Sequence, residues 1–361
     1  MNKWTKWVTL LVLAAILAAC GPQATPEPLI IKETVIVEQV VTAEPPPPAD
    51  APAPPDKVTL RTNWMWYGSH AIFFHGVEKG LYADQNIDVT VKQGNGSGNV
   101  VRLVANKDST FGYVSASTMM NLAAQEAPVI AVATIDATGT DAVLCRPDSG
   151  ITAFEDLRGK DIMTTAGAGV NTFFPVALAN AGMTEADVNI VNVAEGALVS
   201  SYLQNLAPCI LGGMDDKPAE IKANGGEQPI IFNYADYGVY QPGYAIIAHK
   251  DLVAENPDLV KRFVYATLMA TKAAAEDPEA AIQSMINWAG FVEDQKDQAM
   301  EVLGVTLSIL YSPNNTDKVL GYNVPADWES ALGLLKTYNE LETDMTADQF
   351  YTNEFVPTSL P

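Results

Sequence analysis

The strongest constraint in this 361-residue sequence is an alternation of short apolar runs with longer segments of helical periodicity, which begins near Val58. Short runs rich in β-branched and aromatic residues are typical of strands, and apolar residues that recur every three or four positions are typical of helices. The first series predicts strands at 58–61, 87–91, 110–114 and 129–133, with helices between them at 71–82, 99–105 and 117–125. This order indicates a largely parallel sheet with helices on its faces.

The same alternation starts again near Asp161 and predicts a second sheet. Its expected elements are strands at 161–165, 188–193, 209–211 and 230–232, and helices at 172–181 and 197–205. A strand at 244–248 follows, and from Asn256 the chain becomes helical, with further helices expected at 278–288, 295–303 and 326–341. We therefore expect two α/β lobes and a helical C-terminal tail that packs on the first lobe.

The first 57 residues have a different character. Two lysines precede an apolar run from Trp7 to Leu17, and small residues continue to Ala19, which is the pattern of a secretory signal peptide. The apolar run is too short for a membrane-spanning helix. The sequence Leu17-Ala18-Ala19-Cys20-Gly21 resembles the lipobox of bacterial lipoproteins, in which the cysteine is acylated and becomes the N-terminus. This resemblance implies a signal peptide at 1–19 and a lipid on Cys20, which attaches the chain to the extracytoplasmic face of the cell membrane.

A proline-rich linker is expected between Cys20 and the globular part. Residues 21–57 contain ten prolines and no aromatic residue, so they cannot bury a core and should form an extended spacer. Apolar triplets at 29–31 and 35–37 have strand propensity, but prolines isolate them and we assign them to the linker. The expected organisation is then linker at 20–57, lobe 1 at 58–144 and 237–361, and lobe 2 at 145–236.

The charge balance excludes a nucleic-acid role. Asp and Glu number 43 against 21 Lys and Arg, which gives a formal net charge of −22 at pH 7. Phosphate binding needs clustered Lys and Arg. Once the signal peptide is removed the acidity remains, because it belongs to the rest of the chain.

An aromatic loop directly follows the first expected strand. The segment 63–70 reads Asn-Trp-Met-Trp-Tyr-Gly-Ser-His, and ligands of open α/β sheets bind beyond the carboxyl ends of strands. Its rings either stack on a ligand or cap the core. The candidate ligand-binding residues of this loop are Asn63, Trp64, Trp66, Tyr67 and His70.

Two glycine-rich turns and several acids follow other expected strands. The turns at 93–98 and 165–172 each open a helix, and backbone N–H groups there bind anions or ring carbonyls, although plain turns have the same composition. The second turn is the better candidate. Asp215 and Asp236 are placed to accept hydrogen bonds from a ligand, whereas Asp216 is better explained as a solvated carboxylate. The remaining candidate ligand-binding residues are Tyr113, Ser115, Asn171, Thr172 and Tyr237.

Catalytic and metal sites find little support in the sequence. The pair His70 and His75 has the wrong spacing for a metal site, and His249 is distant. The chain has no G-x-S-x-G stretch and no cysteine with a recognisable activating partner. We therefore expect neither a metal nor a resident cofactor, and no enzymatic activity.

Several segments together resemble substrate-binding proteins related to the thiamine-pyrimidine synthase-like family. They are Asn63-Trp64 with His70, 77–82 and 86–89, and further matches at 110–114, 211–213, 235–239 and 255–263. The resemblance covers about residues 58–286 and implies a type II periplasmic-binding fold, with two lobes joined by a two-segment hinge. The hinge segments are expected near 144–146 and 236–243. Asn63 stands where the family has Asp, Trp66-Tyr67 replace smaller residues, and Asp215-Asp216 replace an aromatic pair.

The resemblance also implies a function. It predicts the solute-binding component of an ABC importer, a monomer that delivers a vitamin-type heterocycle to a permease and its ATPase. The extra rings favour riboflavin over the single-ring pyrimidine precursors of thiamine, which stay the alternative. The family's eukaryotic members are pyridoxal-phosphate-dependent pyrimidine synthases, but the cysteine-rich run of those enzymes is absent before the strand at 244–248. A small anion as ligand is disfavoured because the candidate loops carry almost no Lys or Arg. In an oxidising compartment Cys145 and Cys209 are free to pair, although the sequence does not decide whether they do.

Overall fold

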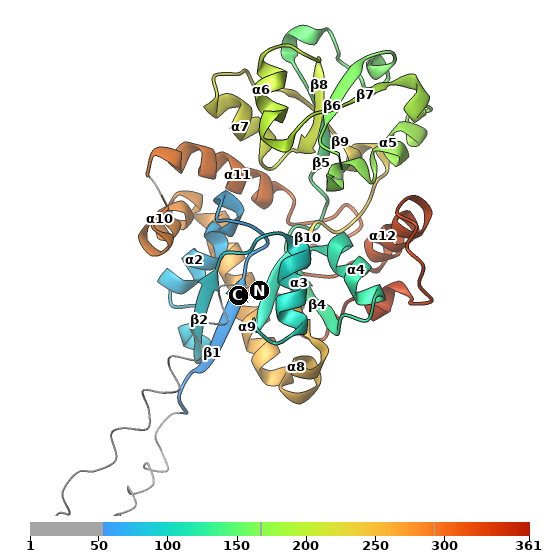
Figure 1. The fold of residues 1–361 in the computed structure, drawn as a ribbon. Helices are drawn as coiled ribbons and strands as arrows, with labels where there is room; N and C mark the ends of the chain where they lie inside the picture. Colours follow the sequence, from blue (N-terminus) through green and yellow to red (C-terminus); the bar gives the residue numbers. More distant parts are fainter. Residues whose placement is uncertain (1–52, 167, 292) are drawn as a thin grey trace, which may run out of the picture. The chain divides into compact units, whose positions relative to one another are not determined.

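The computed structural model describes residues 53–166, 168–291 and 293–361 (Figure 1). The expected signal peptide, Cys20 and nearly all of the linker lie outside the described residues. The linker was expected to reach residue 57, but Asp56 and Lys57 already belong to the first strand, where Asp56 pairs with Ile87. Arg262 fixes the start of this strand, because its Nη2 lies 2.7 Å from the Asp56 carboxylate.

Lobe 1 is built on a five-stranded sheet with the strand order β2-β1-β3-β10-β4. Four of its strands run parallel and β10 runs against both of its neighbours. The sheet is therefore largely parallel, as expected, with one reversed strand. Its strands are β1 (Asp56–Arg61), β2 (Ile87–Lys92), β3 (Phe111–Ser115), β4 (Val129–Thr134) and β10 (Tyr244–His249).

Lobe 2 repeats this arrangement, with the strand order β7-β6-β8-β5-β9 and β5 as the reversed strand. Its strands are β5 (Asp141–Cys145), β6 (Asp161–Thr164), β7 (Asn189–Asn192), β8 (Cys209–Gly213) and β9 (Ile230–Asn233). Helix α5 (Phe174–Asn180) packs on one face of this sheet, and α6 (Leu198–Leu203) and α7 (Lys217–Ala223) pack on the other.

Alternate residues of β3, β4 and β10 contribute to two apolar layers, because successive side chains of a strand point to opposite faces. Phe111 and Ile246 face α2 (Ala71–Glu78), α9 (Pro257–Glu276) and α10 (Pro278–Ala289). Phe111 stacks on Phe263 of α9 with ring centroids 3.8 Å apart. Val114 and Ile247 face α3 (Ser97–Ala105), α4 (Ala116–Ala124) and α12 (Pro325–Tyr338). The C-terminal helices thus pack on lobe 1, as the sequence predicts (Figure 1).

The first passage between the lobes lies earlier than expected. The boundary was expected between residues 144 and 145, with hinge residues at 144–146, but β5 already belongs to the sheet of lobe 2. Val143, Leu144 and Cys145 are fully buried and pair with β8 and β9, so they form an interior strand and not a hinge. The chain passes from lobe 1 to lobe 2 in residues 135–140 and returns between β9 and β10.

Several element boundaries also differ from the sequence expectation. The helix expected at 71–82 ends at Glu78, because Gly80 adopts a positive φ of 72° and Leu81 N–H donates back to the Gly76 carbonyl. Strand β5, helix α7 and helix α8 (Lys250–Glu255) were not expected. Helix α11 (Lys296–Ser308) continues five residues beyond the expected end at residue 303.

Cys145 and Cys209 form a disulfide between β5 and β8. The two cysteines are direct partners in the antiparallel register of these strands, so the sheet itself brings them together. None of the helices in the described ranges is both long enough and apolar enough to traverse a lipid bilayer.

Candidate functional site

A cavity of about 950 Å³ lies between the two lobes. On lobe 1 it is lined by the loops that follow β1, β2 and β3, and on lobe 2 by those that follow β6 and β8. These are the carboxyl ends of the parallel strands, where the sequence predicts a ligand site. Of the expected binding residues, those that line the cavity are Asn63, Trp64, Trp66, Tyr67, Ser115, Thr172 and Asp215.

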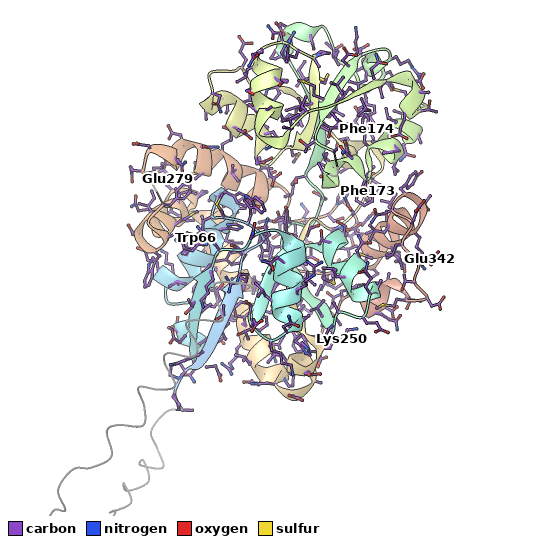
Figure 2. The ribbon with its side chains drawn as sticks, in the orientation of Figure 1. Trp66, Phe173, Phe174, Lys250, Glu279 and Glu342 are labelled. Atoms are coloured by element: carbon purple, nitrogen blue, oxygen red, sulfur yellow. A yellow bond between two sulfur atoms is a disulfide. The ribbon has the colours of Figure 1, made fainter. Side chains whose placement is uncertain are left out.

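The aromatic loop is fixed to the glycine-rich turn that follows β2. Gly96 N–H donates to the Asn63 carbonyl at 2.9 Å, and Gly94 N–H donates to the Trp64 carbonyl at 3.1 Å. Trp64 is 44% exposed in the cavity wall, whereas the Trp66 ring packs edge-on against Phe74 with centroids 5.2 Å apart. Figure 2 shows Trp66 on lobe 1 and Phe173, which also lines the cavity, on lobe 2. Both glycine-rich turns of the sequence contribute to the cavity wall.

His70 lies behind this loop and does not line the cavity, contrary to the expectation. It is fully buried, and its Nε2 lies 2.7 Å from Asn63 Oδ1 while its Nδ1 accepts from Tyr67 N–H at 3.4 Å. Burial lowers the pKa of His70 to about 3, so the ring is neutral. Nε2 then donates to Asn63, whose amide nitrogen in turn donates to Tyr67 Oη at 3.2 Å. His70 therefore orients two residues of the cavity wall.

Tyr113 is a second expected ligand residue that lies behind the wall. It is fully buried and stacks on Tyr244, with ring centroids 5.1 Å apart, and Tyr244 is the ring that reaches the cavity. The carboxyl group of Asp136 is buried near Tyr113, and its Oδ1 has no hydrogen-bond partner among the described residues. Burial, reinforced by the charge of Asp215, raises the pKa of Asp136 well above its ordinary value.

On lobe 2, Asn171 holds the turn that follows β6. Its Oδ1 accepts from the Thr164 hydroxyl, and its Nδ2 donates to the Thr165 carbonyl at 2.9 Å. Both hydrogen bonds are made within the turn. The amide group of Asn171 is therefore occupied and does not line the cavity, contrary to the expectation. The residues of this turn that line the cavity include Thr165, Thr172 and Phe173.

Carboxyl groups gather where β8 ends. Asp215 is only 8% exposed, and burial, followed by the charge of Asp216, raises its pKa to about 7. The Asp216 side chain is 48% exposed, in keeping with the solvated carboxylate that we expected, although it also lines the cavity and lies 3.0 Å from Lys217 Nζ. Lys217 Nζ also lies 2.8 Å from Glu220. Burial raises the pKa of Asp141 to about 6.

The chain packs closely around this acidic group, which explains the two glycines before it. A Cβ on Gly212 would lie 2.6 Å from Lys217 Cγ, and one on Gly213 would lie 2.3 Å from Asp215 Oδ1. The Lys217 stem and the Asp215 carboxylate therefore occupy the space that larger residues would need. Met214 N–H donates to the Thr140 carbonyl at 2.8 Å and ties this loop to the passage between the lobes.

Asp236 and Tyr237 do not reach the cavity. They belong to the 3₁₀ turn 234–237, which follows β9 at the edge of the sheet, and Gly238 with φ of 77° ends it. Tyr237 stacks on Phe154 with ring centroids 4.1 Å apart, its carbonyl accepts from Asn180 Nδ2, and the Asp236 side chain is exposed. The edge position of β9 directs this turn towards α5 and away from the cavity.

The sequence interpretation missed Asp141 and Tyr244, which both line the cavity. Each is the first residue of a reversed strand, and in the register Asp141 pairs with Gly213 and Tyr244 with Ser115. A rule that searches only the carboxyl ends of parallel strands cannot find them. The available signal was their position directly after the passages between the lobes.

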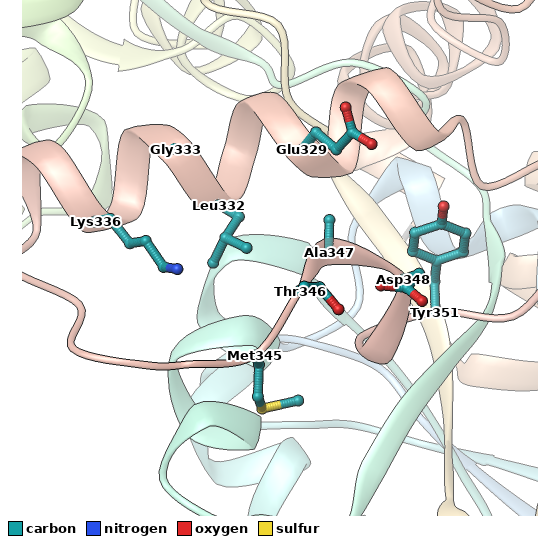
Figure 3. A pocket seen from close by; sticks show the side chains of 9 residues that line it. All are labelled: Glu329, Leu332, Gly333, Lys336, Met345, Thr346, Ala347, Asp348 and Tyr351. Atoms are coloured by element: carbon teal, nitrogen blue, oxygen red, sulfur yellow. The ribbon is translucent and has the colours of Figure 1, made fainter.

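A second hollow of about 560 Å³ lies on lobe 1, between α12 and the segment 345–351 (Figure 3). Leu332 points into the hollow, and Glu329, Lys336 and Asp348 lie around it. It lies away from the loops that end the parallel strands, and none of the expected site residues lines it. The cavity between the lobes is therefore the better candidate for a ligand site.

The profile of the NMT1/THI5-like family matches residues 68–281, more than half of the sequence. The chain belongs to the NMT1/THI5-like family. It is 23% identical over 307 residues to the riboflavin-binding protein RibY of Chloroflexus aurantiacus, covering 83% of this chain and 86% of RibY. It is also 23% identical over 334 residues to the 4-amino-5-hydroxymethyl-2-methylpyrimidine phosphate synthase of Aspergillus parasiticus, covering 81% of this chain and 96% of that protein.

Among solved structures, the fold is similar to the periplasmic aliphatic sulphonate binding protein SsuA of Escherichia coli. The TM-score is 0.63 at 12% identity, over 82% of this chain and 92% of SsuA. At this identity the likeness concerns the fold alone. Together with the two mixed sheets, it confirms the expected type II periplasmic-binding-protein fold.

Proposed function

We propose that this protein is the solute-binding component of an ABC importer and captures an aromatic heterocycle, riboflavin in the first place. The observation that carries the proposal is the aromatic loop, which lies in the wall of a cavity between two lobes. A volume of about 950 Å³ is at the upper end of the usual range for small-molecule sites, and a three-ring ligand needs more room than a single pyrimidine. Similarity to RibY supports the same ligand.

In this proposal the wall residues divide the recognition between them. Trp64, Trp66 and Tyr67 stack on the fused rings, and the polar groups of Asn63, Ser115, Thr172 and Asp215 meet ring carbonyls, ring N–H and ribityl hydroxyls. His70, Tyr113 and Asn171 support this wall from behind. Closure of the lobes about the two crossing segments would enclose the ligand and produce the form that the permease recognises.

The test is a titration of riboflavin with the purified full chain, followed by flavin fluorescence. Stacking of riboflavin on the rings of the cavity wall is expected to quench the flavin emission at micromolar protein concentrations. Unchanged emission across that range would contradict riboflavin as the ligand. Mass spectrometry of any small molecule that co-purifies with the chain is an independent check of ligand identity.

Membrane attachment is proposed to rest on the lipid of Cys20, which also places the lobes outside the cytoplasm. Replacing Cys20 by Ser is expected to abolish incorporation of labelled palmitate. Undiminished palmitate labelling of the Cys20→Ser variant would contradict the lipid anchor.

The alternative ligand is a pyrimidine precursor of thiamine, which the similarity to the pyrimidine phosphate synthase favours. Cleft carboxylates would accept hydrogen bonds from the amino group of such a ring. Displacement of riboflavin by hydroxymethylpyrimidine, or binding of the pyrimidine alone, distinguishes the two ligands. Sulphonate, the ligand in the name of SsuA, is disfavoured because this cavity wall carries more carboxylates than cations.

A further inference from the structure

The charged side chains that line the ligand cavity are mostly acidic. Among the described residues of the wall, Asp141, Asp215, Asp216 and Glu220 carry carboxyl groups, and Lys217 carries the ammonium group. They lie on lobe 2 around the end of β8 and the start of β5. A ligand that enters the cavity therefore faces this acidic side opposite the aromatic loop of lobe 1.

The ammonium group of Lys217 is already engaged. Its Nζ lies 3.0 Å from Asp216 and 2.8 Å from Glu220, and its stem packs over Gly212. Its three donors are thus directed largely to two carboxylates of its own helix terminus. An incoming anion would have to displace one of these carboxylates to gain a cationic partner.

Asp141 and Asp215 have no such partner. Neither forms an ion pair with any residue in the described part of the chain. Asp141 accepts a hydrogen bond from an uncharged group, Gln241 Nε2, at 3.4 Å. Asp215 is nine-tenths buried, it lines the cavity, and its Oδ1 lies over Gly213. Burial raises the pKa of both carboxyl groups, as expected for acids that lack a positive neighbour.

We infer that the cavity selects uncharged or cationic ligands and rejects the phosphate esters of the same compounds, with Asp215 as a specificity-determining residue. The inference rests on the proposed function and specifies its substrate class. A phosphate ester carries close to two negative charges at neutral pH and needs Arg, Lys or free backbone N–H donors. Beside Asp215 it would meet a like charge in a desolvated site, where water screens the repulsion poorly.

The experiment measures the affinity of the full chain for two pairs of compounds by calorimetry at pH 8, where the cleft carboxyl groups are ionised. One pair is riboflavin and riboflavin 5′-phosphate, and the other is hydroxymethylpyrimidine and its phosphate. We expect the uncharged member of a pair to bind at least tenfold more tightly than its ester. Asp215→Asn should reduce that ratio at least threefold.

Asp84→Asn is the matched control. Asp84 is exposed on lobe 1, just before β2, and lies at the opposite end of the strands from the cavity. This variant changes the net charge by the same amount as Asp215→Asn and should leave the ratio unchanged. An equal loss of selectivity in both variants would attribute the effect to net charge and overturn the role of Asp215.

The outcomes for function and specificity are separable. Selectivity within the pyrimidine pair, without riboflavin binding, would overturn riboflavin as ligand and support the inference. Equal or tighter binding of a phosphate ester would overturn the inference and leave the proposed function standing. An unchanged ratio in Asp215→Asn would remove Asp215 from the mechanism, and absence of binding by all four compounds would overturn both proposals.

Discussion

Three rings in the cavity wall are each supported by a second ring behind them. Trp66 packs on Phe74, Tyr244 stacks on Tyr113, and Tyr67 contacts His70 edge-on with centroids 4.3 Å apart. Such pairs favour one orientation of the exposed ring and so would reduce the entropy lost if the proposed ligand stacks on it. Trp64 forms no such pair with a ring in the described part of the chain, and at 44% it is the most exposed ring of the loop.

Truncation of the loop tryptophans should therefore separate binding from stability. Trp64→Ala is expected to weaken ligand binding by about 1–3 kcal/mol and to change the free energy of unfolding by less than about 0.5 kcal/mol. Trp66→Ala should weaken binding similarly and also lower the free energy of unfolding by about 1–3 kcal/mol, because it loses the Phe74 contact. Ligand titration and denaturant unfolding measure the two effects.

The matched control is Trp288→Ala, since Trp288 is 58% exposed on α10 and does not line the cavity. It should change neither quantity. Unaltered ligand affinity in both Trp64→Ala and Trp66→Ala would show that the loop rings do not contact the ligand.

Asp215 should reduce the stability of the fold at neutral and basic pH. Its pKa in the folded chain is about 7, above the ordinary value of about 4 in the unfolded chain, so only the folded state holds the proton between these values. The free energy of unfolding therefore carries no penalty from Asp215 at low pH, and it falls as the pH rises from about 4 to about 7. Asp215→Asn removes this loss and is expected to raise the free energy of unfolding at pH 8 by up to about 4 kcal/mol.

At pH 5 the gain should be clearly smaller, because the folded chain still holds the proton. Denaturant unfolding at the two pH values measures the difference, with the exposed Asp84→Asn as the control that changes little at either pH. A gain that is equal at pH 5 and pH 8 would show that Asp215 does not titrate in this range.

At the scale of elements, the aromatic loop depends on the helix that covers it. Gly68, at the start of the 3₁₀ turn 68–70, lies against α11, and a Cβ there would be 2.0 Å from the Ala299 carbonyl oxygen. The nearest atoms are the Ala299 carbonyl and the Val302 Cβ, and neither is the flexible end of a side chain. Because Gly68 has no side chain, α11 can approach the aromatic loop closely. This explains why a glycine directly follows the aromatic residues of the loop.

Gly68→Ala is accordingly expected to lower the free energy of unfolding by about 1–3 kcal/mol and to weaken ligand binding, because the loop must shift. Gly304→Ala is the control. Gly304 is in α11, the helix that Gly68 packs against, and nothing lies within 4 Å of a Cβ added there. This variant should raise the free energy of unfolding by about 0.5–1 kcal/mol and leave binding unchanged. Equal stability of the two variants would contradict the close approach at Gly68.

Most strands and helices were predictable because each has its own periodicity. Strand β5 was not, since Val143, Leu144 and Cys145 carry no alternation and are buried on both faces of the sheet. The reversed strands β5 and β10 also escaped the rule that locates ligand sites. The direction of each of these strands depends on the lobe from which the chain has just come. The local sequence carries no information about that.

At the scale of the whole molecule, the disulfide stabilises lobe 2. It joins residues separated by 64 positions, which encloses most of this lobe. Breaking it should lower the free energy of unfolding by about 2–4 kcal/mol, because the unfolded chain gains conformational freedom. Denaturant unfolding of the full chain with and without reductant measures this difference. The Cys145→Ala/Cys209→Ala variant should not respond to reductant, and a wild-type chain equally insensitive would contradict the disulfide.

The sequence by itself determined the class of fold, the helical tail on lobe 1, and the aromatic loop at a strand end, because each follows from local periodicity or from residues close together in the chain. The position of each side chain relative to the cavity was decided by tertiary structure. His70 and Tyr113 were placed behind the wall, Asp236 and Tyr237 at a sheet edge, and the acidic cluster opposite the rings. These outcomes depend on which distant elements pack against each residue, and such contacts follow from the three-dimensional fold rather than from spacing along the chain.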